Sequence, residues 1–328
     1  MEEKKGKKIL VSGMKPTGEL HLGNFFGALK QVTELQETHE SSFFIADLHA
    51  LTSVDSPSDL SHFSRELILD CLGVGMDPRV MTLYRQSRVP EVTELAWILS
   101  CRINVSYLTR AHAYKDAQNK NKEVNAGTFT YPILMAADIL IQKADIVPVG
   151  EDQRQHIEYT RDIADRFNAA HGTYFELPEG FVPESVATIP GTDGQKMSKS
   201  YKNTIPLFAE KEVIQKAVMS MPTDSKGVDD PKDPDTCSLF RLHSLISPEE
   251  VCADIRKRYT EGGIGYKEVK ERLIESLDTF IAPLRERRRY YEENPDEVNS
   301  IITSGEERAR SIAREVIRDV RSAIGLTS

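Results

Sequence analysis

Two short polar segments carry residue types that can bind a nucleotide. Residues 15–24 read KPTGELHLGN, and residues 196–200 read KMSKS. The first segment follows a short apolar run and precedes a helical pattern. In that order free backbone N–H groups and the positive end of the helix dipole face the loop, where they bind phosphate. The spacing is that of neither a dinucleotide-binding loop nor a P-loop.

Within these segments, His21 can donate a hydrogen bond to a phosphate oxygen, and the lysines of residues 196–200 can neutralise a departing pyrophosphate. Glycine-flanked residues 196–200 can also close once a nucleotide is bound. The plain alternatives are an exposed polar loop for residues 196–200, a surface histidine for His21 and a solvated charge for Lys15. Both segments in one chain make those alternatives weaker.

A third group of residues is suited to an aromatic ligand. Tyr131, Met135 and Asp138 stand at positions i, i+4 and i+7 of an apolar helical segment, so they share one face. A carboxylate on that face needs a partner, because a buried unpaired charge costs several kcal/mol. The partner is either an arginine or lysine of the protein or an N–H group of a ligand. An aromatic ligand with an N–H edge fits such a face, and indole is one.

These residues need a scaffold, and the first part of the chain predicts a parallel sheet. Apolar runs alternate with helical patterns, which implies right-handed crossovers and a site at the carboxyl ends of the strands. His49 and Gln86 fall at such ends. We expect strands at residues 9–11, 42–46, 80–86 and 145–149, a lysine-rich insertion at about 102–126, an apolar helix at 130–142, a long amphipathic helix ending near 168, and an irregular stretch at 171–188.

The remainder of the chain is predicted to be mostly helical. We therefore expect a Rossmann-like α/β catalytic domain at residues 1–203 and a helical domain at 204–328. Its clearest helices are expected at 249–259, 267–291 and about 306–324, after a polar linker at 222–236. The basic cluster at 285–289 is interpreted as a solvated helix face, with RNA contact as the alternative.

Composition excludes several classes. The chain has 328 residues and a net charge of −9, which fits a soluble globular protein of one or two domains and argues against a general nucleic-acid coat. Without a membrane-length apolar run or an apolar signal sequence, the chain is expected to be cytoplasmic. Four scattered cysteines with no CxxC pair predict free thiols and no metal site.

The two polar segments resemble the signatures of class I aminoacyl-tRNA synthetases, in order and spacing. The first signature usually reads HIGH, and here it stands as HLGN at residues 21–24. Residues 130–140, TYPILMAADIL, and 144–168, ADIVPVGEDQRQHIEYTRDIADRFN, are similar to the tryptophanyl-tRNA synthetases. The resemblance covers Lys8 to Ser200 and, more weakly, the helical tail.

That resemblance implies a reaction and its partners. ATP and L-tryptophan would give tryptophanyl-adenylate and pyrophosphate, and tryptophan would then pass to the 3′ end of tRNA(Trp). Mg²⁺ would be held mainly by the ATP phosphates, no protein nucleophile would be needed, and the chain would form a homodimer with an anticodon-binding helical domain.

The same resemblance, together with the residue chemistry above, assigns the site. The catalytic set is His21, Asn24, Lys196 and Lys199. The ATP-binding set is Lys15, Pro16, Thr17, Gly23, Asn24, Gly150, Glu151, Asp152, Ile189, Lys196, Met197, Ser198, Lys199 and Ser200. Asp138 would accept the indole N–H, with Tyr131, Met135, His49, Val147, Val149 and Gln153 around tryptophan. Asp152 can equally serve as a helix N-cap.

Departures and rivals keep three alternatives open. Lys15 and the stretch PGTDGQKMSKSYKN at residues 190–203 resemble a sub-group of these enzymes, some members of which hold an iron–sulfur cluster on four cysteines. The corresponding residues 259–269 contain no cysteine here, so no cluster is predicted. A tyrosyl-tRNA synthetase shares the architecture, and a small-molecule adenylyltransferase can share the first signature. A non-catalytic synthetase-like protein that binds RNA or a partner is the third alternative, and two intact signatures argue against it.

Overall fold

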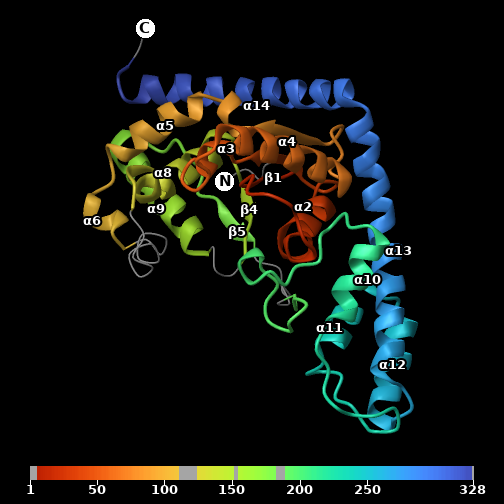
Figure 1. Ribbon diagram of the computed structural model, residues 1–328. Coiled ribbons are helices and arrows are strands. Elements are labelled where there is room, and N and C mark those ends of the chain that lie inside the picture. The colour runs from red at the N-terminus through yellow and green to blue at the C-terminus, as the bar shows by residue number, and fades with distance from the viewer. Residues whose placement is uncertain (1–5, 111–123, 151–153, 182–188, 327–328) are drawn as a thin grey trace.

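A parallel sheet forms the centre of the molecule. The computed structural model describes residues 6–110, 124–150, 154–181 and 189–326 (Figure 1). The strand order is β3-β2-β1-β4-β5. The strands are β1 (Ile9–Met14), β2 (Glu40–Ile45), β3 (Met81–Arg85), β4 (Ile146–Pro148) and β5 (Glu179–Phe181). The sheet confirms the predicted Rossmann-like α/β class, and its first four strands lie at the predicted apolar runs.

The edge strand β5 was not predicted, and the expectation of an irregular stretch at 171–188 was wrong at this point. All three of its residues are exposed, so no apolar run indicates a strand. It forms because β4 offers a parallel partner, with Ile146 opposite Glu179. The backbone N–H of Val149 continues this pairing to the carbonyl of Phe181, at 3.0 Å.

Helices surround the sheet and then extend away from it. In the α/β part they are α1 (Leu22–Asn24), a π-helical turn (Phe25–Leu29), α2 (Lys30–Leu35), α3 (Asp47–Ala50), α4 (Pro57–Gly73), a 3₁₀ turn (Gln86–Arg88), α5 (Glu91–Ser100), α6 (Val105–Leu108), α8 (Ala126–Ile141) and α9 (Arg154–His171). Beyond them lie a 3₁₀ turn (Lys199–Tyr201), α10 (Lys211–Met219), α11 (Ser238–Ile246), α12 (Glu249–Glu261), α13 (Tyr266–Glu293) and α14 (Pro295–Ala323).

Alternation along the strands separates two hydrophobic cores, one on each face of the sheet. Phe43 and Leu83 point into a core that includes α2, α4 and the helices α10 to α13. Their neighbours Phe44 and Tyr84 point into a second core with α5, α8 and α9. Because successive strand residues face opposite sides, a strand segment buried on both faces carries apolar residues at consecutive positions, as at residues 9–11 and 43–45. This explains the continuous apolar runs in the sequence.

Helix α14 joins the two cores and begins earlier than expected. It starts at Pro295 and not near residue 306. Ser304 and Gly305 are weak helix formers, which made this stretch look like a boundary. Packing requires the glycine, because a Cβ at Gly305 would lie 1.9 Å from the carbonyl oxygen of Leu83. The helix therefore crosses strand β3 at direct backbone contact, along the top of the molecule in Figure 1.

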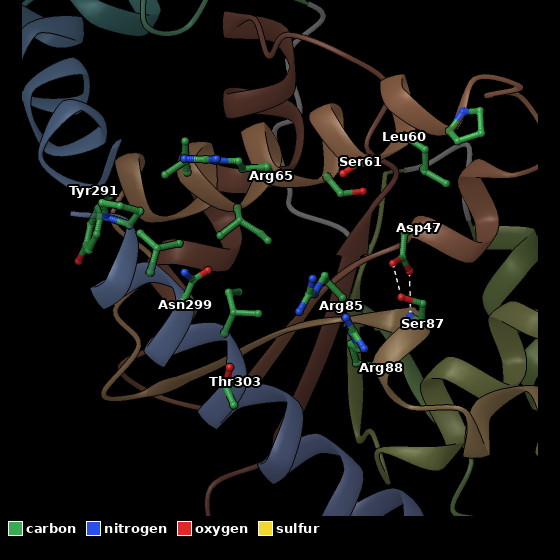
Figure 2. A pocket seen from close by; sticks show the side chains of 17 residues that line it. Asp47, Leu60, Ser61, Arg65, Arg85, Ser87, Arg88, Tyr291, Asn299 and Thr303 are labelled. Atoms are coloured by element: carbon green, nitrogen blue, oxygen red, sulfur yellow. Dashed lines mark hydrogen bonds between the residues drawn. The ribbon is translucent and has the colours of Figure 1, made fainter. Parts of the chain in front are cut away.

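The amino-terminal part of α14 also faces helix α4 across a cavity of about 580 Å³ (Figure 2). Leu69 and Ile68 of α4 and Val298 and Ile302 of α14 lie on its apolar side. The cavity lies near the carboxyl end of β3, but none of the residues that line it belongs to the site expected from the sequence.

We expected the basic cluster at residues 285–289 to be a solvated helix face. Instead, it links α13 to the α/β part. Arg288 bonds Asp70 of α4 at 2.7 Å (Nε to Oδ1) and also pairs with Glu66. The Nη1 group of Arg287 donates to the carbonyl of Gly73 at 2.9 Å. Arg287 and Arg289 remain exposed, and Arg289 pairs with Glu210 on the surface. A charge pattern alone does not distinguish a solvated row from one that pairs with a distant helix.

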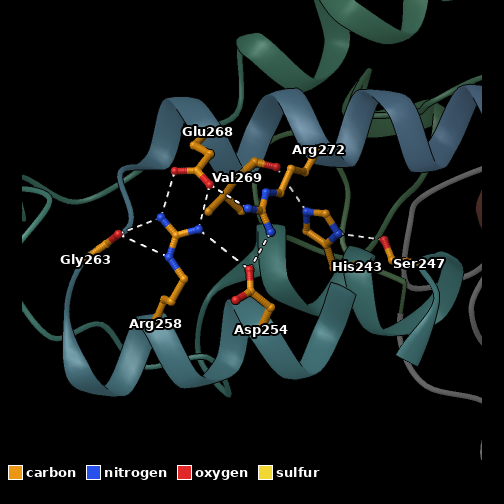
Figure 3. Close-up of polar contacts among 8 residues, drawn as sticks. All are labelled: His243, Ser247, Asp254, Arg258, Gly263, Glu268, Val269 and Arg272. Carbon is orange, nitrogen blue, oxygen red and sulfur yellow. Dashed lines mark hydrogen bonds and ion pairs between the residues drawn. The ribbon is translucent and has the colours of Figure 1, made fainter. Parts of the chain in front are cut away.

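A second polar network fixes α12 against α13 (Figure 3). Glu268 accepts hydrogen bonds from Arg258 and Arg272, each at 2.7 Å, and Arg272 also reaches Asp254 at 2.6 Å. His243 is fully buried beneath this network, and its burial lowers the pKa of the imidazole. The charged groups therefore join α12 to α13, and His243 on α11 adds a contact of its Nε2 with the carbonyl of Val269 at 3.0 Å.

Candidate active site

The two polar segments meet although they lie about 180 residues apart. Lys199 Nζ donates to the carbonyl of Thr17 at 3.3 Å. The backbone beyond the second segment pairs with the first, since Leu22 N donates to the carbonyl of Ile205 at 3.0 Å. This pairing places residues 196–200 against residues 15–24. The structure thus builds one loop cluster from the two predicted halves.

His21 occupies the start of the first helix. The side chain of Asn24 accepts a hydrogen bond from the backbone N–H of His21 at 3.0 Å, which fixes the turn. The ring packs closely over Gly23, where a Cβ would lie 2.9 Å from His21 Nδ1. Any larger residue at position 23 would displace the imidazole, which explains the glycine of this signature.

The electrostatics around His21 keep the imidazole neutral. Burial, and secondarily the positive charge of Lys199, lower the pKa of His21 to about 4. Its Nδ1 is buried and has no hydrogen-bond partner among the residues that the structure describes. A neutral ring can donate one hydrogen bond without repelling the nearby lysine. Partial desolvation also lowers the pKa of Lys199 and of Lys15, whose Nζ lies 3.5 Å from Thr52 Oγ1.

Asn203 holds the second segment in place. Its side-chain oxygen accepts from the backbone N–H of Ser198 at 2.7 Å, and its Nδ2 group donates to Asp193 at 2.7 Å and to the carbonyl of Lys196 at 3.0 Å. Met197 anchors the segment in the core, while Lys196 and Lys199 remain exposed. The loop thus presents its two lysines from a fixed base.

Asp138 lies at the bottom of the second half of the site, 2% exposed. Both of its oxygens accept from Gln86 Nε2 at 2.8 Å, and Oδ2 also faces His49 Nε2 at 2.8 Å. The partners inside the protein are thus a histidine and an amide, not the arginine or lysine that the sequence suggested. Burial raises the pKa of Asp138. A carboxylate has about four acceptor positions, so one on Oδ1 is left for a ligand donor.

The other residues expected around an aromatic ligand lie near this carboxylate or along the same core. The Tyr131 ring contacts His49 edge-on, with the centroids 6.3 Å apart, and its hydroxyl bonds His156. Met135 and Val149 are half-buried, and Val147 is buried in the core on β4.

The placement of the remaining predicted residues varies. Pro16 and Ile189 are buried in the loop cluster, whereas Thr17 and Ser200 are exposed and Gly150 is half-buried after β4. Glu151, Asp152 and Gln153 lie outside the described residues.

Three residues in this arrangement were not assigned from the sequence: Gln86, Asn203 and His156. Gln86 was noted only as the end of a strand, but it is 0% exposed, and its Oε1 accepts from the backbone N–H groups of Leu48 and His49 at 3.1 and 3.3 Å. Its place at the carboxyl end of a predicted strand was the available signal. No comparable pattern distinguishes Asn203 or His156 within polar stretches.

Known proteins resemble this chain in both sequence and fold. The family model "tRNA synthetases class I (W and Y)" matches residues 3–282. Tryptophan–tRNA ligases of Fusobacterium nucleatum and Rhodopirellula baltica are 44% and 45% identical, over 97% of this chain and 98% and 99% of theirs. The crystal structure of the Campylobacter jejuni tryptophanyl-tRNA synthetase, complexed with ADP and tryptophan, has a TM-score of 0.90 at 41% identity and covers 97% of this chain and 99% of that one.

The fold and the paired loops define an aminoacyl-tRNA synthetase of class I. The chain belongs to the class I tRNA synthetase family for tryptophan and tyrosine. Within that family, tryptophan–tRNA ligases of bacteria are 40–45% identical over 97% of this chain. A tyrosyl-tRNA synthetase of Archaeoglobus fulgidus shares the fold at 17% identity, with a TM-score of 0.68.

Proposed function

We propose that this enzyme, a tryptophan–tRNA ligase, binds the indole of tryptophan at Asp138 and ATP between the two loop segments. The observation that carries the first assignment is the remaining acceptor position on Oδ1 of a carboxylate that His49 and Gln86 hold rigidly. Tyr131, Met135, Val147, Val149 and Gln153 would surround the ring. A fixed, buried acceptor rejects a ring without an N–H group, because the acceptor would then stay unpaired.

In the first step the tryptophan carboxylate attacks the α-phosphate of ATP, and pyrophosphate leaves. His21, Asn24, Lys15, Lys196 and Lys199 would supply hydrogen bonds and positive charge to the phosphates, so catalysis is positioning and electrostatic stabilisation. The backbone and side chains of Pro16, Thr17, Gly23, Gly150, Glu151, Asp152, Ile189, Met197, Ser198 and Ser200 would complete the ATP site. Mg²⁺ would bind mainly to the phosphates.

A ribose hydroxyl of the terminal adenosine of tRNA(Trp) then attacks the adenylate, and AMP leaves. The helical part from residue 204 onward would bind the anticodon end of the tRNA, and residues 1–203 would form the catalytic domain. We place this reaction in the cytoplasm. None of the described helices is long and apolar enough to cross a membrane.

The enzyme would act as a homodimer. The support is two exposed apolar side chains in the α/β part: Trp97 on α5 is 72% exposed and Val105 on α6 is 67% exposed. Sedimentation velocity tests the assignment, since Trp97→Lys should shift the population toward monomers. An unchanged dimer, or a monomeric wild type, would contradict it.

Substitution of Asp138 tests the tryptophan assignment. Asp138→Asn keeps the size of the side chain but presents a donor to Gln86 and His49, so we expect tryptophan-dependent pyrophosphate exchange to fall at least about 100-fold. The KM for ATP should change little. Asp162→Asn on the surface of α9 is the control. Unchanged exchange in the Asp138 variant would sink the assignment, and preferred exchange with tyrosine would identify the rival substrate.

A further inference from the structure

The cavity between α4, α14 and the end of β3 has a lining that the reaction does not use. Arg65 of α4 and Arg85 and Arg88 at the end of β3 lie around it, and Asn299 and Thr303 of α14 face it (Figure 2). Its volume of about 580 Å³ is within the range of small-molecule sites. The cavity is therefore large enough for a metabolite-sized ligand.

The charge of this lining favours an anion. Arg65 and Arg88 form no ion pair with any residue in the part of the chain that the structure describes. Arg85 pairs with Glu306 through Nε at 2.6 Å. Asp47 is the only acidic residue among the described lining residues, and it already accepts hydrogen bonds from the backbone N–H and the hydroxyl of Ser87. Two guanidinium groups are thus available for a carboxylate or phosphate.

Apolar side chains of α4 and α14 line the same cavity beside these polar groups. Ile68, Leu69, Val298 and Ile302 are each less than 9% exposed. A ligand that contacts both the arginines and these apolar side chains needs an anionic group and an apolar body. A nucleic-acid backbone offers anionic groups without an apolar body, so the lining favours a small organic anion over RNA.

The cavity touches the tryptophan site through a single turn of chain. Within residues 85–88, Arg85, Ser87 and Arg88 line the cavity, while Gln86 points the other way and bonds Asp138. Asp47, bonded to Ser87, also accepts from the backbone N–H of Leu48 at 3.1 Å, next to His49. An occupant that fixes this turn would fix both partners of the indole acceptor.

We propose that this cavity binds a small organic anion, an apolar body bearing a phosphate or carboxylate, and that its occupancy strengthens tryptophan binding. The coupling rests on the proposed tryptophan site, whereas the binding does not. By linkage, tryptophan must strengthen binding of the anion by the same factor.

Phenyl phosphate is a suitable probe, with phenol and inorganic phosphate as its two halves. Calorimetric titrations use enzyme already saturated with tryptophan and a non-hydrolysable ATP analogue, so that the reaction site is filled. We expect one phenyl phosphate per chain, at least tenfold weaker binding in Arg65→Ala/Arg88→Ala, and unchanged binding in the control Arg318→Ala, an exposed α14 arginine outside the lining. Phenol and phosphate should each bind more weakly.

Equal binding by wild type and the double variant, or no binding by wild type, would overturn the site. Phosphate binding as tightly as phenyl phosphate would overturn the apolar body. Weaker tRNA binding in the double variant, with phenyl phosphate binding unchanged, would assign the arginines to RNA instead.

The coupling has a separate readout. Phenyl phosphate should lower the tryptophan KM of wild type in pyrophosphate exchange about fivefold or more, and should not do so in the double variant. An unchanged tryptophan KM despite arginine-dependent binding would overturn the coupling alone. Failure of the Asp138 test with arginine-dependent binding intact would instead refute the proposed tryptophan site and leave the anion site standing.

Discussion

Gln86 shows how one uncharged side chain can support a charged one. Its Nε2 group donates to both oxygens of Asp138, and its Oε1 accepts from two backbone N–H groups at the start of α3. The amide therefore orients the carboxylate and α3 as a unit. We propose a positioning role for Gln86, because it would act on tryptophan through Asp138.

Gln86→Leu should raise the KM for tryptophan about tenfold or more, because Asp138 loses two hydrogen bonds and rotates more freely. The KM for ATP should stay within about twofold, which a general loss of folding would not allow. Pyrophosphate exchange at varied tryptophan gives both values. Gln142→Leu is a matched control, since Gln142 is equally buried and bonds the carbonyl of Ala309 away from the site. Equal effects of the two variants would count against the assignment.

His21 offers a test of how close the two loops lie. Its folded pKa of about 4 is below the ordinary value of 6.5, so the unfolded chain takes up the proton first as pH falls. This residue should therefore lower the free energy of unfolding between pH 6.5 and 4 and have no effect above pH 7. In Lys199→Met the nearby positive charge is absent, and the pKa of His21 should rise. NMR titration of the imidazole measures it in both proteins; identical values would contradict the proximity.

At the scale of elements, Gly305 reverses the usual effect of a helix substitution. In an exposed helix Gly→Ala stabilises by about 1 kcal/mol. Here the added methyl group would meet the carbonyl of Leu83, so Gly305→Ala should lower the free energy of unfolding by about 2 kcal/mol or more. Denaturant unfolding compares it with Ser304→Ala, one residue earlier on the exposed side. A stabilised Gly305→Ala protein would show that α14 does not dock on β3.

The sequence predicted elements whose residues follow a local pattern. Continuous apolar runs indicated β1 to β4, and the two signature loops indicated a nucleotide site. Contacts between distant segments were not predictable in this way. Strand β5 forms because β4 offers a partner. The start of α14 depends on a glycine that contacts β3. The ion pairs of Arg288 depend on residues of helix α4. Gln86 and Asn203 belong to the same group, because each acts by bonding residues that only the fold brings near.

For the whole molecule, Arg288 connects the helical part to the α/β part. Burial raises the pKa of its partner Asp70 to about 6, although the hydrogen bond from Arg288 opposes this rise. Arg288→Met would leave the buried Asp70 without its cationic partner, and we expect a loss of about 3–5 kcal/mol in the free energy of unfolding.

This loss should depend on pH. Without Arg288 the pKa of Asp70 rises further, so at pH 5 the carboxyl is protonated and its burial costs less than at pH 7.5. Chemical denaturation at the two pH values measures the difference. Arg289→Met, next along α13, is the control, because its pair with Glu210 is exposed and should contribute under about 1 kcal/mol. Equal losses in the two variants would contradict the link.

The crossing of α14 over β3 also bears on how the molecule behaves among copies of itself. An open sheet ends in two strands whose outer N–H and C=O groups can recruit a strand from another chain. Strand β3 is one such end, and α14 lies against its backbone at Leu83. The other end, β5, is three residues long and offers few such groups. Helix α14 therefore covers the longer edge strand, β3. A chain in which this helix detaches would expose that strand edge as a template for aggregation.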